Sequence, residues 1–503
     1  MKDSGKHHKF TRSLSAFGSA TLISRVLGYL RDAAVAAYFG GGYQTDAFYA
    51  AFKIPNLLRR FLGEGSLTAA FVPVFTGTLH KKGKEEAARL YDAVLTGLLA
   101  VLAVCVVLGI IFAPQVTQIV SWGFVRDPEV FRLTTQLTRL TFPFLLLICV
   151  AALMTAVLNS CGRFFVPAVA PSGLSIGEIL FIVFLASRTK YPIQGLAVAA
   201  VVGVGIHLIW QVPAMRQEGY RFKIVNPLNH PEVKTVLFLM IPTIIGLCAD
   251  QVNSFVDQFC ASFLKEGSIT ALYNSNRVMQ LPLALFGVAV ASVALPALSH
   301  TASEENMHDF KEMLGFSIRI ANYVLIPSFV GLAAIGVPIV KLLFQHGHFK
   351  PEYTLMTYQA MVGFSVGLPA YSATRIFASA FYARKNTKTP VRIAFQAMTV
   401  NAILDFALMW KYTVGGLAFA TSAAGWYQAV VLFWMLRKEL GLLGGREIIK
   451  SFVFSSVAGL VMGLLCYGLT YMVLTKLPLA LNVLISITVG SAFYLSVSKL
   501  LKV

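Results

Sequence analysis

The chain has 503 residues, of which 56% are hydrophobic and 13% are charged, and its formal net charge is +19. A soluble protein of this length usually carries about 25% charged residues, so the composition argues against a soluble domain. The basic residues gather in short loops between apolar runs, which argues against a nucleic-acid-binding surface and is typical of cytoplasmic loops in a membrane protein.

Apolar runs long enough to cross a bilayer recur along the chain, from residues 93–113 to residues 452–474. Since a crossing takes about 20 residues, we predict an all-α integral membrane protein with about fourteen transmembrane helices. The alternating segments that a membrane β-barrel requires do not occur. The expected helix centres lie near Arg25, Arg60, Ala103, Ile148, Glu178, Gly203, Asp250, Val288, Ile326, Tyr371, Met398, Trp426, Gly463 and Val489.

Most lysines and arginines fall in loops on the side of the N-terminus, which predicts that both termini are cytoplasmic. The basic start of the chain runs into a stretch interrupted by Arg25, Arg31 and Asp32, so we expect no cleaved signal peptide. The cysteines show no metal-binding spacing, and we expect free thiols.

The first expected span carries charges that lipid would not tolerate, because an arginine at the bilayer midplane costs about 2.5–3.5 kcal/mol. Arg25 and Asp32 are seven residues apart and share one helix face, with Arg31 at its edge. We expect that face to turn toward a cavity or the protein interior.

In the second expected span, residues 45–75, helical periodicity aligns Arg60 with other charged residues and turns Arg59 away. Pro55, Gly63 and Gly65 should disturb the helix, however. Periodicity therefore leaves Arg59 and Arg60 as equal candidates. The charged residues aligned with Arg60 are Asp46, Lys53 and Glu64.

The eighth expected span adds Arg277 as a further cation within the membrane. A guanidinium binds phosphate oxygens in pairs and keeps its charge, so several arginines with few carboxylates favour a polyanionic ligand such as a diphosphate. The alternative is an internal salt-bridge network in which Asp32, Asp46 and Glu64 neutralise the arginines.

Two proline pairs indicate an internal repeat. The separation in sequence between Pro73 and Pro296 is the same as that between Pro167 and Pro390. This shared offset fits a duplication of six spans into two pseudo-symmetric lobes that are related by an axis along the membrane normal and hold substrate between them. We therefore predict lobes at residues 1–225 and 226–440, followed by two further helices at 441–503.

A cluster of oxygen-bearing residues is expected in the second lobe. Asn401 and Asp405 are four residues apart on one helix face. Asp250 and Asp257 lie in span seven, and Thr421 lies in span twelve. Such oxygens suit a hard cation, but membrane helices use the same residues for polar contacts with one another. The residues alone favour the second interpretation.

With these motifs the chain resembles the MurJ (MviN) family of lipid II flippases, within the multidrug/oligosaccharidyl-lipid/polysaccharide exporter superfamily. The resemblance spans nearly the whole chain and is strongest in SRVLGYLRD, TDAFYAAFKIPNLLRRFLGEGSLTAAFVPVF, NRVMQLPLALFGVAVASVALPALS and FYARKNTKTPV. It implies two six-helix lobes around a central cavity, a groove for a lipid tail beside the last two helices, and a place in the bacterial inner membrane.

The resemblance also assigns residues, and it favours Arg59 over Arg60. A family sodium site would reverse the preference for polar contacts in the second lobe, and Asp250 has no counterpart in that site. Asn276 and Gln280 depart from members that carry acidic residues there, which puts an ion pair of Arg277 in doubt. The implied substrate-binding residues are Arg25, Arg31, Asp32, Asp46, Arg59, Glu64 and Arg277, and the implied sodium ligands are Asp257, Asn401, Asp405, Thr421 and a carbonyl near Leu417.

The implied function is the transfer of lipid II, an undecaprenyl-diphosphate-linked disaccharide pentapeptide, from the cytoplasmic to the periplasmic leaflet. Alternating access driven by membrane potential or an ion gradient is expected, because no nucleotide-binding P-loop occurs. We expect a monomer that is not an enzyme, with membrane lipids as its other partners and sodium as its one possible cofactor.

Two other functions use the same features differently. An exporter of the same fold could carry drugs or another polyprenyl-diphosphate glycan, although a drug and cation antiporter would want an acidic cavity. A membrane enzyme, such as a polyprenyl-phosphate transferase, would need an acidic metal cluster on a cytoplasmic loop. The most acidic such loop, residues 301–312, has scattered carboxylates.

Overall fold

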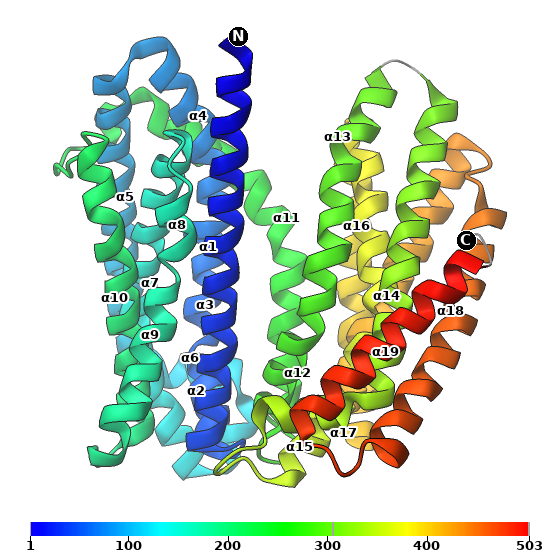
Figure 1. The fold of residues 1–503 in the computed structure, drawn as a ribbon. Coiled ribbons are helices and arrows are strands. Elements are labelled where there is room, and N and C mark those ends of the chain that lie inside the picture. The colour runs from blue at the N-terminus through cyan, green and yellow to red at the C-terminus, as the bar shows by residue number, and fades with distance from the viewer. Residues whose placement is uncertain (1, 304–305, 501–503) are drawn as a thin grey trace. The chain divides into compact units, whose positions relative to one another are not determined.

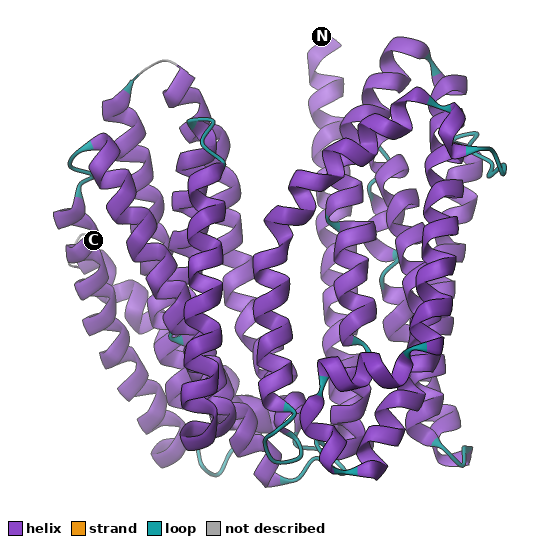
Figure 2. Cartoon of the chain, turned by 180° about the vertical axis from the view of Figure 1, so that it is seen from behind, coloured by secondary structure: helices purple, strands orange, loops and turns teal. Residues whose placement is uncertain are grey.

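The computed structural model describes residues 2–303 and 306–500, with side chains from residue 19 onward except at 249 and 250. Within these ranges the chain forms helices and loops and no strand (Figures 1 and 2). In the described part, 10 helical segments are long and apolar enough to cross a membrane. The predicted all-α membrane fold is confirmed, whereas the count of fourteen helices stays a prediction.

The chain divides into two compact units, unit 1 at Met1–Gln251 and unit 2 at Val252–Val503. The lobe boundaries predicted near residues 225 and 440 stay a prediction. The helices of unit 1 are α1 (Lys2–Phe39), α2 (Tyr43–Ala51), α3 (Lys53–Arg59), α4 (Ser66–Lys82), α5 (Lys84–Ile111), α6 (Ala113–Val120), α7 (Pro128–Ser160), α8 (Phe165–Val169), α9 (Ser172–Leu180) and α10 (Pro192–Gln217).

Helix α11 (Pro231–Ala261) begins in unit 1 and ends in unit 2. In unit 2, α14 packs closely against α18. The remaining helices of unit 2 are α12 (Ser268–Pro282), α13 (Ala289–Ser303), α14 (Met307–Phe344), α15 (Pro351–Ser365), α16 (Leu368–Ala383), α17 (Lys388–Leu440), α18 (Gly445–Gly468) and α19 (Leu479–Leu500).

The second expected span is divided rather than continuous. After α3 the backbone forms a wide π-helical turn, η1 (Arg60–Glu64), before α4 begins. Gly65 closes this turn, and a Cβ added there would collide with the carbonyl oxygen of Arg60. Only glycine permits that approach. The predicted disturbance is therefore present, and it explains why ideal periodicity could not choose between Arg59 and Arg60.

Unit 2 contains the same irregularity at the offset found from the prolines. A second π-helical turn, η6 (Leu283–Val288), follows η1 at the same separation as Pro296 follows Pro73, and it also leads directly into a helix, α13. Pro73 lies inside α4 and Pro296 inside α13. The π-helical turns thus add a backbone feature to the two proline pairs that indicated a repeat.

Helix α17 contains two expected spans joined by a sharp turn at Thr413. Its backbone has φ +49° and ψ −134° there. A Cβ on Gly416 would lie 2.7 Å from the carbonyl oxygen of Leu408, a position that a continuous helix would place about 12 Å away. The chain therefore reverses at Thr413, which separates residues 388–412 from residues 414–440.

Small residues bring α9 and α10 together in unit 1. A Cβ on Gly177 would lie 2.8 Å from the Cα of Gly203, and one on Gly173 would lie 2.7 Å from the backbone nitrogen of His207. Glycines at this spacing allow membrane helices to approach closely and pack by dispersion contacts. The contact fixes α9, which carries a buried carboxylate toward α1.

Candidate functional site

Arg31 lies beside two buried carboxylates in unit 1. Its Nη2 donates to Oδ1 of Asp32 at 2.6 Å, and its Nε lies 3.7 Å from Oε2 of Glu178 in α9. Asp32 is 1% exposed and Glu178 is 4% exposed. The guanidinium of Arg31 is held in position by contacts with both carboxylates. Its positive charge offsets part of their negative charge, and a buried carboxylate without such a partner would be costly.

Glu178 is a site residue that the sequence analysis missed, since it was taken only as the centre of a span. One signal could have identified it: Glu178 and Asn401 are separated by the same offset as the two proline pairs. Asn401 is an expected ion ligand, so the residue at the same offset in unit 1, Glu178, is a candidate site residue as well.

Around the π-helical turn, the structure separates the two arginines that periodicity could not. Arg59 is half-buried, and its Nη1 donates to Oε1 of Glu64 at 2.9 Å. Arg60 is exposed. The turn therefore brings Arg59 together with Glu64.

The other predicted residues of unit 1 lie in different settings. Arg25 is exposed on α1, although Asp32 seven residues later is buried. Asp46 is 2% exposed in the first turn of α2, where a negative charge complements the helix dipole. Asp32 and Glu64 thus form ion pairs of the kind weighed as the alternative to phosphate binding, and these carboxylates orient the guanidinium groups of Arg31 and Arg59.

Arg277 lies half-buried on α12 in unit 2. The two neighbours that depart from the family pattern contact one another, because Nε2 of Gln280 donates to Oδ1 of Asn276. Neither side chain carries a charge, so this pair adds no carboxylate next to Arg277. Positions 276 and 280 therefore provide no acidic residue for the local ion pair of Arg277 that the sequence put in doubt.

The oxygen-rich cluster predicted for unit 2 is assembled from three segments. Nδ2 of Asn401 donates to Oδ1 of Asp257 at 3.1 Å and to Oδ2 of Asp405 at 2.8 Å. Oγ1 of Thr421 lies 3.4 Å from Oδ2 of Asp257 and donates to the carbonyl of Leu417 at 3.2 Å. All five predicted ligands are therefore neighbours, whereas the side chain of Asp250 lies outside the described residues.

The chemistry of this cluster fits a small hard cation. Asn401 and Asp405 are fully buried, and Oδ1 of each accepts no hydrogen bond within the described part of the chain. Buried acceptors without a donor are costly, and a neutral amide between two carboxylates cannot offset their charge. A monovalent cation such as sodium would supply positive charge, and the two Oδ1 atoms that accept no hydrogen bond could serve as its ligands.

Comparison with known proteins finds relatives that are described as lipid II flippases. A family model described as "Lipid II flippase MurJ" matches residues 35–488. A "Probable lipid II flippase MurJ" of Vibrio cholerae is 34% identical over 502 residues, which is 96% of this chain and 94% of that protein.

Solved structures give the same result. A structure titled "Lipid II flippase MurJ, inward closed conformation" superposes with a TM-score of 0.80 at 28% identity, over 97% of this chain and 99% of the other. An inward-facing multidrug resistance MATE family transporter of the MOP superfamily superposes with a TM-score of 0.68 at 13% identity, over 84% and 96% of the chains. The second likeness concerns the fold alone.

Proposed function

The chain belongs to the lipid II flippase MurJ family, and we propose on that basis that it moves lipid II from the cytoplasmic to the periplasmic leaflet of the bacterial inner membrane. The observation that carries this proposal is the family match over residues 35–488, which contains all predicted site residues except Arg25, Arg31 and Asp32. We propose a transporter for peptidoglycan synthesis rather than an enzyme, because the relatives are named as flippases.

The arginines are proposed to receive the diphosphate of the substrate. Arg31 and Arg59 are each oriented by a carboxylate and half-buried, and Arg25 and Arg277 add further positive charge. Diphosphate oxygens would replace the carboxylates as acceptors of the guanidinium hydrogen bonds, because both kinds of anion form strong, often bidentate, pairs with arginine. We propose Asp32, Asp46 and Glu64 as the residues that keep the unloaded site neutral enough to stay folded.

Transport by alternating access is proposed from the connection between α1 and α2. Gly40 follows α1 with φ +74°, a conformation that other residues rarely adopt. A short glycine-rich connection can absorb backbone change at a hinge. We propose that α1 moves when the site opens to the other side, driven by membrane potential or an ion gradient in a monomeric protein with cytoplasmic termini.

We further propose that the cluster of Asp257, Asn401, Asp405, Thr421 and the Leu417 carbonyl holds a sodium ion. The ion would supply a positive charge to a buried acidic cluster. These residues pack three segments of unit 2 together, so ion binding would favour one packing of that unit. An ion changes the opening equilibrium only by binding the two states with different affinity.

A depletion experiment tests the function. Cells in which this protein is the only lipid II flippase are depleted of it, and the lipid II exposed on the periplasmic side is measured by enzymatic cleavage from outside. We expect accessible lipid II to fall while total lipid II rises. Unchanged exposure after depletion would reject the proposal, and accumulation of a different polyprenyl-diphosphate glycan would identify the exporter alternative.

A further inference from the structure

The linker between α10 and α11, residues 218–230, is fixed to unit 1 at its first residues. Tyr220 is 2% exposed and packs against the rings of Phe75 and Tyr91, with ring centroids at 5.8 Å and 6.1 Å. Burial raises the pKa of Tyr220, so its phenol stays neutral. Nε of Arg163 also lies 2.8 Å from Oε1 of Glu218. The linker therefore starts from an anchored position.

Side chains of α5 then hold the extended backbone of the linker at one depth. The backbone nitrogen of Lys223 donates to Oδ1 of Asp92 at 3.1 Å, and that of Val225 donates to Oγ1 of Thr96 at 3.3 Å. Asp92 is the last charged residue of α5, and residues 93–111 carry none. The linker thus lies where the apolar length of this membrane helix begins, which is the level of the lipid headgroups.

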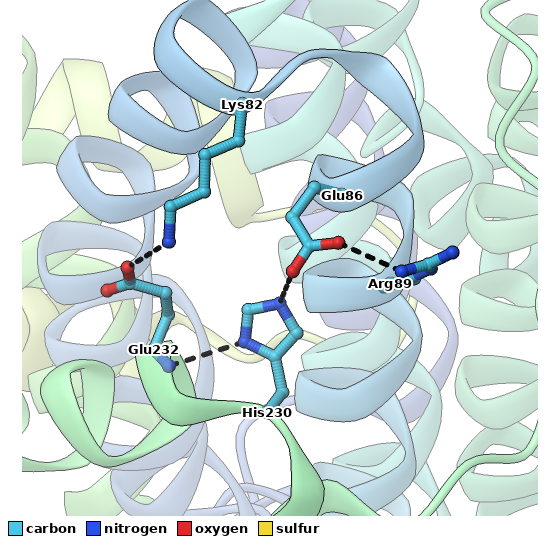
Figure 3. A network of polar contacts seen from close by, with 5 residues as sticks. All are labelled: Lys82, Glu86, Arg89, His230 and Glu232. Carbon is cyan, nitrogen blue, oxygen red and sulfur yellow. Dashed lines mark hydrogen bonds and ion pairs between the residues drawn. The ribbon is translucent and has the colours of Figure 1, made fainter.

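The far end of the linker is fixed by a charged network (Figure 3). Nε2 of His230 lies 3.4 Å from Oε1 of Glu86, whose Oε2 accepts from Arg89 at 3.2 Å. Nζ of Lys82 pairs with Oε1 of Glu232 at 3.0 Å. Because both ends and the middle are held, the outward side of the linker is a defined surface.

That outward side combines apolar and basic residues. Ile224 is 83% exposed and Leu228 is 73% exposed. Phe222 is also exposed, and it lies between Arg221 and Lys223, which are both exposed. Large aliphatic side chains this open to water are unfavourable, whereas apolar side chains among basic ones suit the boundary between acyl chains and anionic headgroups.

We propose that this linker is an interfacial anchor that binds acidic phospholipid, with Phe222, Ile224 and Leu228 inserted among the acyl chains and Arg221 and Lys223 paired with a headgroup phosphate. The linker is one of the loops that carry the excess of lysine and arginine, which by the positive-inside rule face the cytoplasmic leaflet and its anionic lipids. This site is separate from the substrate site, and its failure would leave the proposed transport of lipid II untouched.

The test places an environment-sensitive fluorophore on Ile224→Cys in the full-length protein, with all native cysteines replaced by alanine or serine, in lipid nanodiscs. Quenching by brominated phosphatidylglycerol is compared with quenching by brominated phosphatidylcholine at equal mole fraction. We expect quenching by both lipids, stronger for phosphatidylglycerol, and a preference that the double variant Arg221→Gln, Lys223→Gln removes. A label that neither lipid quenches, or that both quench equally in the unaltered linker, overturns the proposal.

Two controls isolate the linker. The same label at Val104, which is 58% exposed on α5 within its apolar stretch, should respond equally to both lipids. The variant Arg446→Gln, Lys450→Gln removes two exposed cations elsewhere and should keep the preference at Ile224→Cys.

A measurement without a label tests the same proposal if the cysteine-free protein does not fold. Added phosphatidylglycerol should raise the thermal stability of the wild type at about tenfold lower concentration than it does for the Arg221→Gln, Lys223→Gln variant. Equal responses would reject the anchor.

Discussion

Glu178 in α9 and Asn401 in α17 are separated by the same offset as the two proline pairs, and each contacts a charged cluster of its own unit. In unit 1, Glu178 and Asp32 lie beside the guanidinium of Arg31. In unit 2, the amide of Asn401 donates to the carboxylates of Asp257 and Asp405. A fixed positive side chain compensates the acidic pair of unit 1, whereas the amide of unit 2 is neutral, which is why a bound cation is proposed there alone.

Removing Glu178 should disturb unit 1 through Arg31. Glu178→Ala is expected to lower the free energy of unfolding by about 1.5–3 kcal/mol, because it removes a charged contact with the guanidinium of Arg31 while the pair of Arg31 with Asp32 remains, and Glu178→Gln should cost less. Thermal unfolding of purified protein and complementation of a depleted strain measure the two effects. As a control, Glu218→Gln breaks a more exposed pair with Arg163 and should change stability by about 0–1 kcal/mol. Equal destabilisation by the Glu178 and Glu218 variants would show that Glu178 contributes no more to stability than a more exposed ion pair does.

Arg59 and Arg60 should differ in function although they are adjacent. Arg59→Ala is expected to abolish complementation at native protein level, because a half-buried guanidinium oriented by Glu64 is lost. Arg60→Ala should have a milder effect, since Glu64 pairs with Arg59 and the family resemblance assigns the binding role to Arg59. Arg25→Ala, Arg31→Ala and Arg277→Ala are expected to fail as Arg59→Ala does. Normal growth of the Arg59→Ala strain contradicts the assignment.

Sodium should stabilise the wild-type protein more than potassium does at equal ionic strength. Thermal shift or calorimetry on purified protein measures the response, and Asp405→Ala should abolish it because the fully buried carboxylate of the cluster is gone. Asp309→Ala removes a side chain that is 57% exposed outside this cluster and should leave the response intact. If both salts act alike on the wild type, the cluster serves only as polar contact between helices.

The close approach of α9 and α10 should not tolerate a larger residue. A Cβ on Gly203 would lie 2.8 Å from the Cα of Leu174, so Gly203→Ala is expected to destabilise unit 1 by about 1–3 kcal/mol. Gly205 lies on the same helix with nothing within 4 Å of an added Cβ, and Gly205→Ala should be neutral. Thermal unfolding compares the two variants, and equal midpoints would mean that the contact does not hold α9.

Accessibility at Ala36 should report the proposed movement of α1. Ala36 is 2% exposed in this structure, so a cysteine there is expected to be protected from a membrane-impermeant thiol reagent. Substrate or membrane potential should change the labelling rate if α1 moves. Labelling of Ala36→Cys that is the same under all conditions would argue against alternating access through this helix.

The sequence predicted features that depend on local chemistry. Apolar length located the membrane helices, and the glycines and proline of the second span indicated a broken helix where η1 occurs. It could not choose Arg59 without the resemblance, because a π-helical turn changes the direction of every later side chain. Glu178 was missed for another reason: its partner Arg31 is far away in the chain, and only folding brings α1 and α9 together.

The paired π-helical turns also decide how the two units can be compared residue by residue. A π-helical turn is wider than an α-helical turn, so it changes the direction of the side chains that follow it. Because η1 and η6 begin at the same offset as the two proline pairs, one constant offset pairs residues on both sides of the irregularity. Residues of the two units can therefore be matched without a gap at these turns.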